Sequence, residues 1–124
     1  MAEYNFSIAN TLTTLIAERK YSTVRDILVT MNPSDIAYIF DELEDDRLPV
    51  FFRLLPKELA ADTFVEMEAD AQELLIRGFS DTELREILSE MYVDDAVDVI
   101  EEMPANVVRR ILEQADPQMR KEIN

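Results

Sequence analysis

The acidic residues of segment 93–102 are the ones whose types and spacing could do chemistry. Asp94 and Asp98 stand four positions apart, so a helix would bring their carboxylates one turn apart on the same face. Like charges at this spacing destabilise a helix slightly, and a divalent cation would remove the repulsion. The pattern therefore indicates a cation-binding face. A solvated surface helix in an acidic protein has the same pattern, so the residues alone leave both interpretations open.

The chain lacks the residues that most enzyme sites require. Its 124 residues include no His and no Cys, which excludes Ser-His-Asp and Cys-His catalytic sites and zinc sites with the usual ligands. The single glycine, Gly78, excludes loops that hold phosphate with two or three glycines. It does not complete an EF-hand either, because Leu75 and Arg77 stand where that loop needs acids. We therefore expect a binding or regulatory module and no enzyme.

The net charge limits the partners further. The chain has 12 basic and 27 acidic residues, a formal net charge of −15, although residues 1–30 are neutral. Segment 58–102 alone holds fifteen acids against two arginines. Such a polyanion repels nucleic acid and anionic membrane surfaces, so we expect neither as a direct partner. The partners that the charge favours are cations, basic proteins, or an acidic surface bridged by cations. No apolar run approaches the roughly 20 residues that a membrane-spanning helix needs.

A twelve-residue repeat supplies the elements that position these acids. From residue 31 onward an apolar anchor recurs every twelve positions: Met31, Leu43, Leu55, Met67, Phe79, Met91, Met103 and Ala115. Further apolar residues follow each of the first seven anchors by five, eight and nine positions, with Thr63 and Gln72 as exceptions. These offsets are those of an amphipathic helix, so each unit predicts a short helix and a tight turn.

The predicted fold is all-α, an α-solenoid-like stack of short helices in one domain spanning 1–124. Its neutral N-terminal helices occupy 1–30 and its acidic repeats 31–122. Prolines, the caps Asn32 and Asp116, and a capping box at Ser80 and Glu83 mark the helix starts. Pro49 predicts that one helix starts late or kinks. The ten expected helices are 5–20, 22–31, 33–43, 45–54, 56–66, 69–77, 81–91, 93–102, 104–114 and 117–122.

Three segments resemble a known family. They are LLPKELAADTFVEM (54–67), SDTELREILSEM (80–91) and VDDAVDVIEEM (93–103). Together they are similar to the cytoplasmic N-terminal domain of MgtE-type magnesium transporters and channels, whose L-P-x-E-x-A-A repeats lead into L-x-x-D-D-x-x-D. The resemblance covers about residues 5–122. It implies a right-handed superhelix of helices, followed in the whole protein by two CBS domains and a membrane pore domain.

The resemblance also implies a site and a function. Asp94 and Asp98 match family acids that line magnesium sites between the N domain and the CBS domains, Asp62 matches an acid that is often Glu, and Asp95 falls within the motif. Mg²⁺, weakly bound and shared with the CBS domains, would hold the acidic faces together and favour the closed pore. The domain would lie at the cytoplasmic face of the cell membrane without touching it directly, in a homodimeric full-length protein.

Two other functions compete with this one. The L-P-x-E repeats are also similar to helical repeats of the flagellar motor switch protein, which would make the chain a structural adaptor. That family mixes basic and acidic residues on one helix, whereas all the charged residues of segment 93–102 are acidic. The third alternative is a generic acidic module that binds a basic protein.

Overall fold

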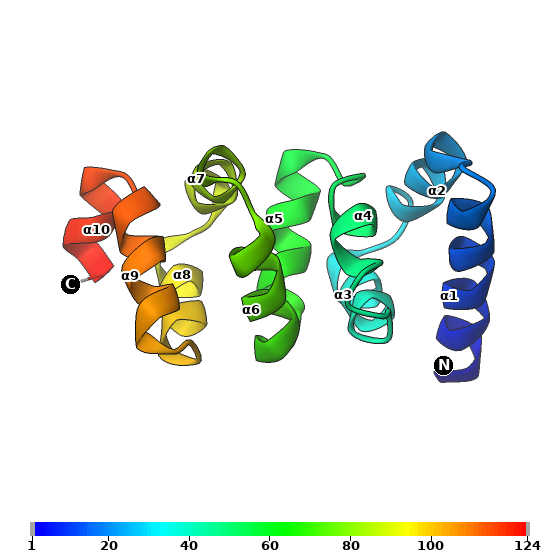
Figure 1. Ribbon diagram of the computed structural model, residues 1–124, viewed down its shortest axis with the longest axis horizontal. Helices are drawn as coiled ribbons and strands as arrows, with labels where there is room; N and C mark the ends of the chain where they lie inside the picture. The colour runs from blue at the N-terminus through cyan, green and yellow to red at the C-terminus, as the bar shows by residue number, and fades with distance from the viewer. Residues whose placement is uncertain (1, 124) are drawn as a thin grey trace. The chain divides into compact units, whose positions relative to one another are not determined.

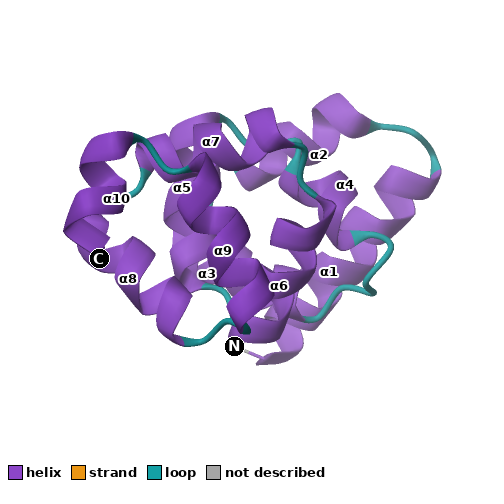
Figure 2. Ribbon diagram, turned by 60° about the vertical axis from the view of Figure 1, so that its left-hand side comes forward, coloured by secondary structure: helices purple, strands orange, loops and turns teal. Residues whose placement is uncertain are grey.

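Ten α-helices and no strand make up residues 2–123, which the computed structural model describes, with side chains from residue 8 onward (Figures 1 and 2). This confirms the predicted all-α class. The helices are α1 (Ala2–Ala17), α2 (Tyr21–Leu28), α3 (Pro33–Asp41), α4 (Leu48–Phe52), α5 (Lys57–Glu66), α6 (Ala69–Gly78), α7 (Asp81–Glu90), α8 (Val93–Glu101), α9 (Ala105–Gln114) and α10 (Pro117–Ile123).

The chain divides into two compact units, which we call unit 1 (up to Met67) and unit 2 (from Glu68). In unit 1, α3 packs against α1, α4 and α5, and α2 packs against α1. Its core contains a cluster of four phenylalanine rings among aliphatic side chains. The ring of Phe40 lies 6.2 Å from that of Phe51 and 6.5 Å from that of Phe52, and Phe52 lies 6.2 Å from Phe64, with all the ring pairs tilted or edge-on. Such arrangements stabilise a core beyond the area that they bury.

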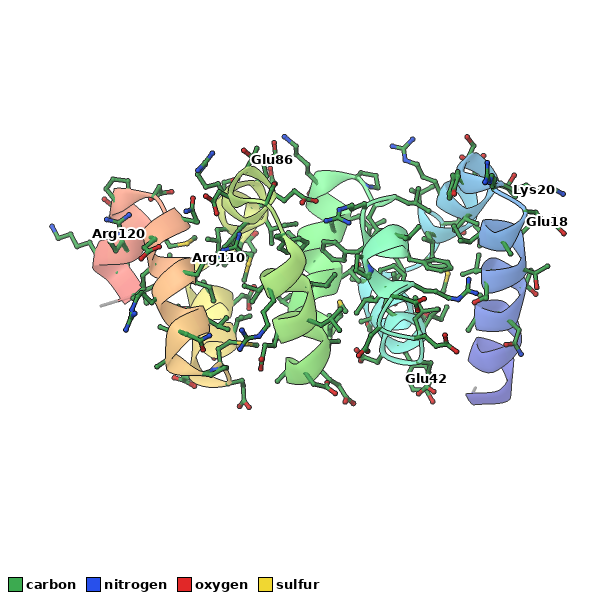
Figure 3. The ribbon with its side chains drawn as sticks, viewed as in Figure 1. Glu18, Lys20, Glu42, Glu86, Arg110 and Arg120 are labelled. Carbon is green, nitrogen blue, oxygen red and sulfur yellow. The ribbon has the colours of Figure 1, made fainter. Side chains whose placement is uncertain are left out.

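Unit 2 has a different construction. Helix α9 packs against α6 and α7, and α8 packs against α10. The side chains at its centre are mainly aliphatic: Leu75, Ile76, Leu84, Ile87, Leu88, Val99, Val107 and Ile111. Arginines add polar links between helices. Arg110 of α9 donates to the backbone carbonyls of Ile76 and Phe79 at the end of α6, and it pairs with Asp81 of α7 at 3.1 Å (Figure 3).

Capping residues start three helices as predicted. Asn32 accepts a hydrogen bond from the Asp35 amide at 3.0 Å. Asp116 accepts one from the Met119 amide at 2.8 Å. Ser80 and Glu83 form both halves of a capping box. These bonds satisfy amides that the first turn of a helix otherwise leaves without partners.

Three predicted helices differ from the observed ones by three residues at an end, and one of them is the helix expected over 22–31, which is α2, Tyr21–Leu28. The helix expected over 45–54 is only α4, Leu48–Phe52, because Pro49 is confined to a first turn, so its late start is confirmed and its length was overestimated. The helix expected over 5–20 begins at Ala2 and stops at Ala17. Arg19 takes a left-handed conformation with φ 62°, and the amides of Arg19 and Lys20 close the last turn of α1.

Burial follows the repeat even where the residue type does not. Among the anchors, five are buried and Met31, Leu43 and Met103 are half-buried. Thr63 and Gln72, the polar exceptions, are buried like their apolar counterparts. The position within the repeat therefore decides burial, and the polarity of the residue is secondary.

Candidate functional site

The acids of α8 form one outward face of this helix. Its inner side is fixed by the buried Ala96 and Val99, in a helix that packs against α10. Asp94 and Asp98 are exposed and lie one turn apart, which places their Cβ atoms about 5–6 Å from each other. Glu101 and Glu102 are exposed as well, and Asp95 is half-buried. The amphipathic pattern thus gives α8 a rigid position and turns its carboxylates to solvent.

No lysine or arginine in the described part of the chain pairs with Asp94, Asp95 or Asp98. Asp94 and Asp95 lie in the first turn, where the partial positive charge of the helix end favours carboxylates. That effect does not reach Glu101 and Glu102, which lie at the opposite end of α8, where negative charge is unfavourable. The acidic face is therefore left without internal neutralisation.

The donor set fits a partial site for a hard cation. Mg²⁺ takes oxygen ligands and keeps several waters, so one or two carboxylates from one surface are enough. Within residues 2–123 no group of three or more acids is gathered closely enough to hold a metal ion alone. The face on α8 supplies half of a site, and a second surface has to supply the remainder.

The remaining predicted ligand lies elsewhere. Asp62 belongs to α5 in unit 1, where its side chain is exposed beside the buried Ala61 and Thr63. Of the four predicted ligands, unit 2 thus brings together the three that share α8: Asp94, Asp95 and Asp98.

Tyr92 is a feature of this region that the sequence analysis did not single out. Tyr92 is 79% exposed, whereas the other exposed large apolar residues with described side chains are 38–44% exposed. It occupies the N-cap of α8 without capping it. A signal was present in the repeat: the residue after each anchor is otherwise a capping residue, a proline or a glutamate, so a tyrosine there is out of pattern.

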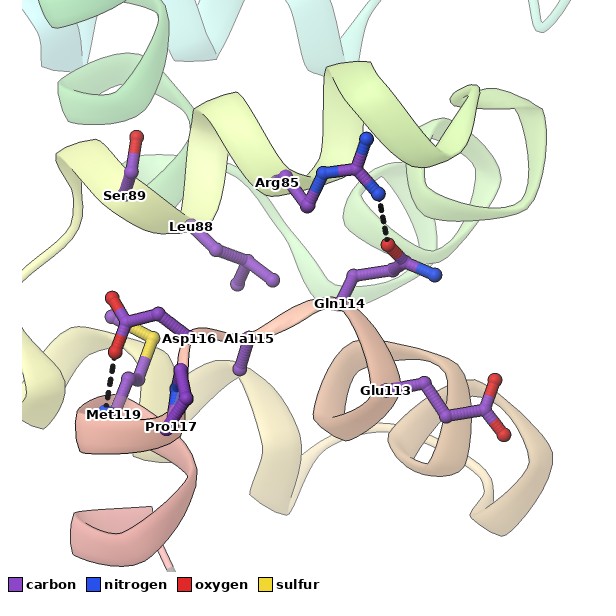
Figure 4. Close-up of a pocket in the computed structure, with 9 residues that line it drawn as sticks. All are labelled: Arg85, Leu88, Ser89, Glu113, Gln114, Ala115, Asp116, Pro117 and Met119. Atoms are coloured by element: carbon purple, nitrogen blue, oxygen red, sulfur yellow. Dashed lines mark hydrogen bonds between the residues drawn. The ribbon is translucent and has the colours of Figure 1, made fainter.

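Unit 2 also has an open groove of about 400 Å³ between α7 and the turn from α9 to α10 (Figure 4). Leu88, Ala115 and Met119 give it an apolar floor. At one end Arg85 donates to the side chain of Gln114 at 2.8 Å, which links α7 to α9. The nine lining residues are Arg85, Leu88, Ser89, Glu113, Gln114, Ala115, Asp116, Pro117 and Met119. The groove is built for apolar contact and does not present a cluster of ligands for an ion.

Comparison with known proteins agrees with the resemblance. The MgtE intracellular N domain family matches residues 11–124. A crystal structure of the cytosolic domain of the Mg²⁺ channel MgtE in complex with ATP has the same fold, with a TM-score of 0.78 and 28% identity. The match covers 93% of this chain and 48% of that one, so the chain spans about half the length of the channel's cytosolic domain.

No curated protein matches the chain significantly. None of the helices within the described residues is long and apolar enough to cross a membrane. Since the family match extends over nearly the whole sequence, the chain belongs to the MgtE intracellular N domain family.

Proposed function

We propose that the chain is the magnesium-sensing regulatory domain of a magnesium transporter or channel. In this proposal its acidic face on α8 docks onto CBS domains of the same polypeptide when Mg²⁺ is plentiful, and the docked state favours the closed pore. The observation that carries the proposal is a helix whose acids face solvent without internal partners, in a member of the MgtE intracellular N domain family.

The charge distribution supports a regulated contact. Glu101 and Glu102 weaken the end of α8, where the helix dipole disfavours negative charge, so the stability of the helix does not account for them. Two like charges about 4 Å apart repel by about 1 kcal/mol in water and about 4 kcal/mol at an effective dielectric constant of 20. Several such pairs across an interface would keep two acidic surfaces apart, and a shared divalent cation offsets that repulsion.

The residues have separate tasks in this mechanism. Asp94 and Asp98 would donate carboxylate oxygens to Mg²⁺ from one turn of α8, and Asp95 would extend the acidic surface of that helix. Asp62, on α5 of unit 1, would be a further Mg²⁺ ligand. Ala96 and Val99 hold the helix to its unit, so the carboxylates keep their spacing before docking. A single carboxylate pair binds so strongly hydrated a cation weakly, which suits a sensor that responds to changes in its concentration.

The wider context belongs to the same proposal. The family leads us to expect downstream CBS and membrane domains, a homodimeric assembly and a place at the cytoplasmic face of the membrane. The length and composition of the chain lead us to expect that residues 1–124 form a single domain. Family membership favours this role over a structural adaptor or a module that binds a basic protein.

Protease protection in the full-length protein tests the proposal. Mg²⁺ at millimolar concentration should protect the segment after residue 124, and NaCl of equal ionic strength should not. Asp94→Asn combined with Asp98→Asn should raise the Mg²⁺ needed for protection several-fold, or abolish protection.

A matched control separates a specific site from loss of charge. Glu90→Gln with Glu113→Gln removes the same charge from exposed residues of α7 and α9. This control should keep the Mg²⁺ response of the wild-type protein. Protection of the Asp94/Asp98 variant at the wild-type Mg²⁺ concentration would show that these residues are not the sensor.

A further inference from the structure

The residue after each anchor of the repeat has a structural task in most repeats. In six of the helices it is the N-cap residue, and the two of these that bond the first-turn amides through their side chains are Asn32 and Ser80. Asp116 does the same for α10. Pro56 and Pro104 limit the backbone at the starts of α5 and α9. The position therefore normally contributes to starting a helix.

Tyr92 contributes nothing of this kind. Its side chain makes no capping bond, so the first turn of α8 lacks the hydrogen bond that Ser80 gives α7. A side-chain cap of this sort stabilises the start of a helix. Burial does not compensate for the loss, since 79% of Tyr92 is exposed. The fold thus gains neither a cap nor core area from this residue, and its use has to lie at the surface.

The backbone holds this side chain in a fixed place. Met91, directly before it, is buried, and the Met91 amide donates to the Leu88 carbonyl at 3.2 Å. The Tyr92 carbonyl accepts from the Ala96 amide at 3.1 Å. An aromatic side chain on a rigid backbone loses little entropy on binding, and tyrosine is enriched among the residues that contribute most to interfaces.

We propose that Tyr92 is the main apolar contact for docking: the surface that docks onto the acidic face of α8 also covers the Tyr92 side chain. The occupant is the part of the same polypeptide that carries the second half of the magnesium site, so this inference rests on the proposed function. The related channel's cytosolic chain has about as much length outside the match as within it, which is enough to supply such a surface. Asp94 and Asp98 then make docking sensitive to Mg²⁺, and Tyr92 provides affinity that does not depend on the ion.

The test replaces tyrosine by the residue that the repeat itself uses as a cap. In the 124-residue chain, Tyr92→Ser should raise the melting temperature by about 3–5 °C, because serine at this position can cap α8 as Ser80 caps α7. In the full-length protein at a fixed Mg²⁺ concentration, the same substitution should lower the docking equilibrium constant about tenfold, as measured by protease protection. The opposite signs exclude misfolding as the cause.

Two further variants complete the test. Tyr38→Ala removes another exposed tyrosine, from α3, and should leave docking unchanged. The steepness of the Mg²⁺ response should stay as in wild type for Tyr92→Ser and fall for Asp94→Asn with Asp98→Asn. Wild-type docking by Tyr92→Ser would overturn the inference and leave the proposed function standing. If Tyr92→Ser weakens docking but the double Asp variant responds to Mg²⁺ as wild type does, the role of Tyr92 in docking is supported. The proposal that Asp94 and Asp98 sense magnesium is then wrong.

Discussion

The two units of the chain are built from the same repeat but are held together differently. In unit 1 the rings of Phe40, Phe51, Phe52 and Phe64 form a continuous aromatic cluster. In unit 2 the core is aliphatic, and arginines bond to backbone carbonyls across turns. Arg110 binds the end of α6, and Arg120 donates to the carbonyls of Leu112, Glu113 and Ala115. The aromatic cluster of unit 1 buries apolar area, and the arginines of unit 2 add directional bonds.

The use of arginines in the internal contacts of unit 2 helps to explain why the acids of α8 have no basic partners among the described residues. Unit 2 has only six basic residues against fifteen acidic ones. Four of the six have partners away from α8: Arg77 pairs with Glu73, Arg85 binds Gln114 and Thr82, and Arg110 and Arg120 bind carbonyls. Most of the basic side chains of unit 2 are therefore occupied in structural contacts, and none in the described part of the chain pairs with Asp94 or Asp98. A unit stabilised in this way can keep a charged surface available for docking.

Removing an aromatic ring should have the largest effect and should be confined to unit 1. Phe40→Ala deletes a fully buried ring that contacts two others, so unit 1 should lose about 3–5 kcal/mol of stability. Hydrogen exchange of the amides in α3 and α5 measures the loss, and α7 and α9 should keep most of their protection. Equal loss of protection in both units would break the comparison, because the units would then unfold together.

Removing the arginine link should have a smaller effect, confined to unit 2. Arg110→Met keeps the apolar stem but leaves the carbonyls of Ile76 and Phe79 without this donor, at a cost of about 1.5–3 kcal/mol. Urea unfolding with exchange of the α6 and α9 amides measures it. Asp81→Asn is the control, since an ion pair this exposed is worth less than about 1 kcal/mol. If Asp81→Asn lowers the stability of unit 2 more than Arg110→Met does, the ion pair and not the bonds to the carbonyls stabilises this contact.

Much of the fold was predictable because the repeat is local. Twelve-residue spacing and capping residues identified ten helices, and the constraint that proline puts on φ identified the late start of α4. The arginine links were not predictable. Arg110 and the carbonyl of Ile76 are 34 residues apart, and an arginine beside Val107 and Val108 looks the same in sequence whether it faces solvent or a helix end.

The candidate site was predictable to the same extent. Spacing alone placed Asp94 and Asp98 on one face of a helix, and the structure exposes both. Whether an acid has a basic partner depends on contacts between distant helices, which spacing does not encode. Tyr92 was not singled out from the sequence, because its exposure depends on how α7 and α8 meet at the buried Met91.

The smallest effect concerns a polar group in the core of unit 1. Thr63 is fully buried on α5, and its hydroxyl has no hydrogen-bond partner in the described part of the chain. Thr63→Val removes that hydroxyl and keeps the branched shape, so it should stabilise unit 1 by about 1 kcal/mol, measured by urea unfolding. Thr63→Ser keeps the hydroxyl and loses a methyl group, so it should destabilise by about 1 kcal/mol. Stabilisation by both, or by neither, would show that the hydroxyl is not the weak point of this core, and the contrast with the bonded polar groups of unit 2 would not hold.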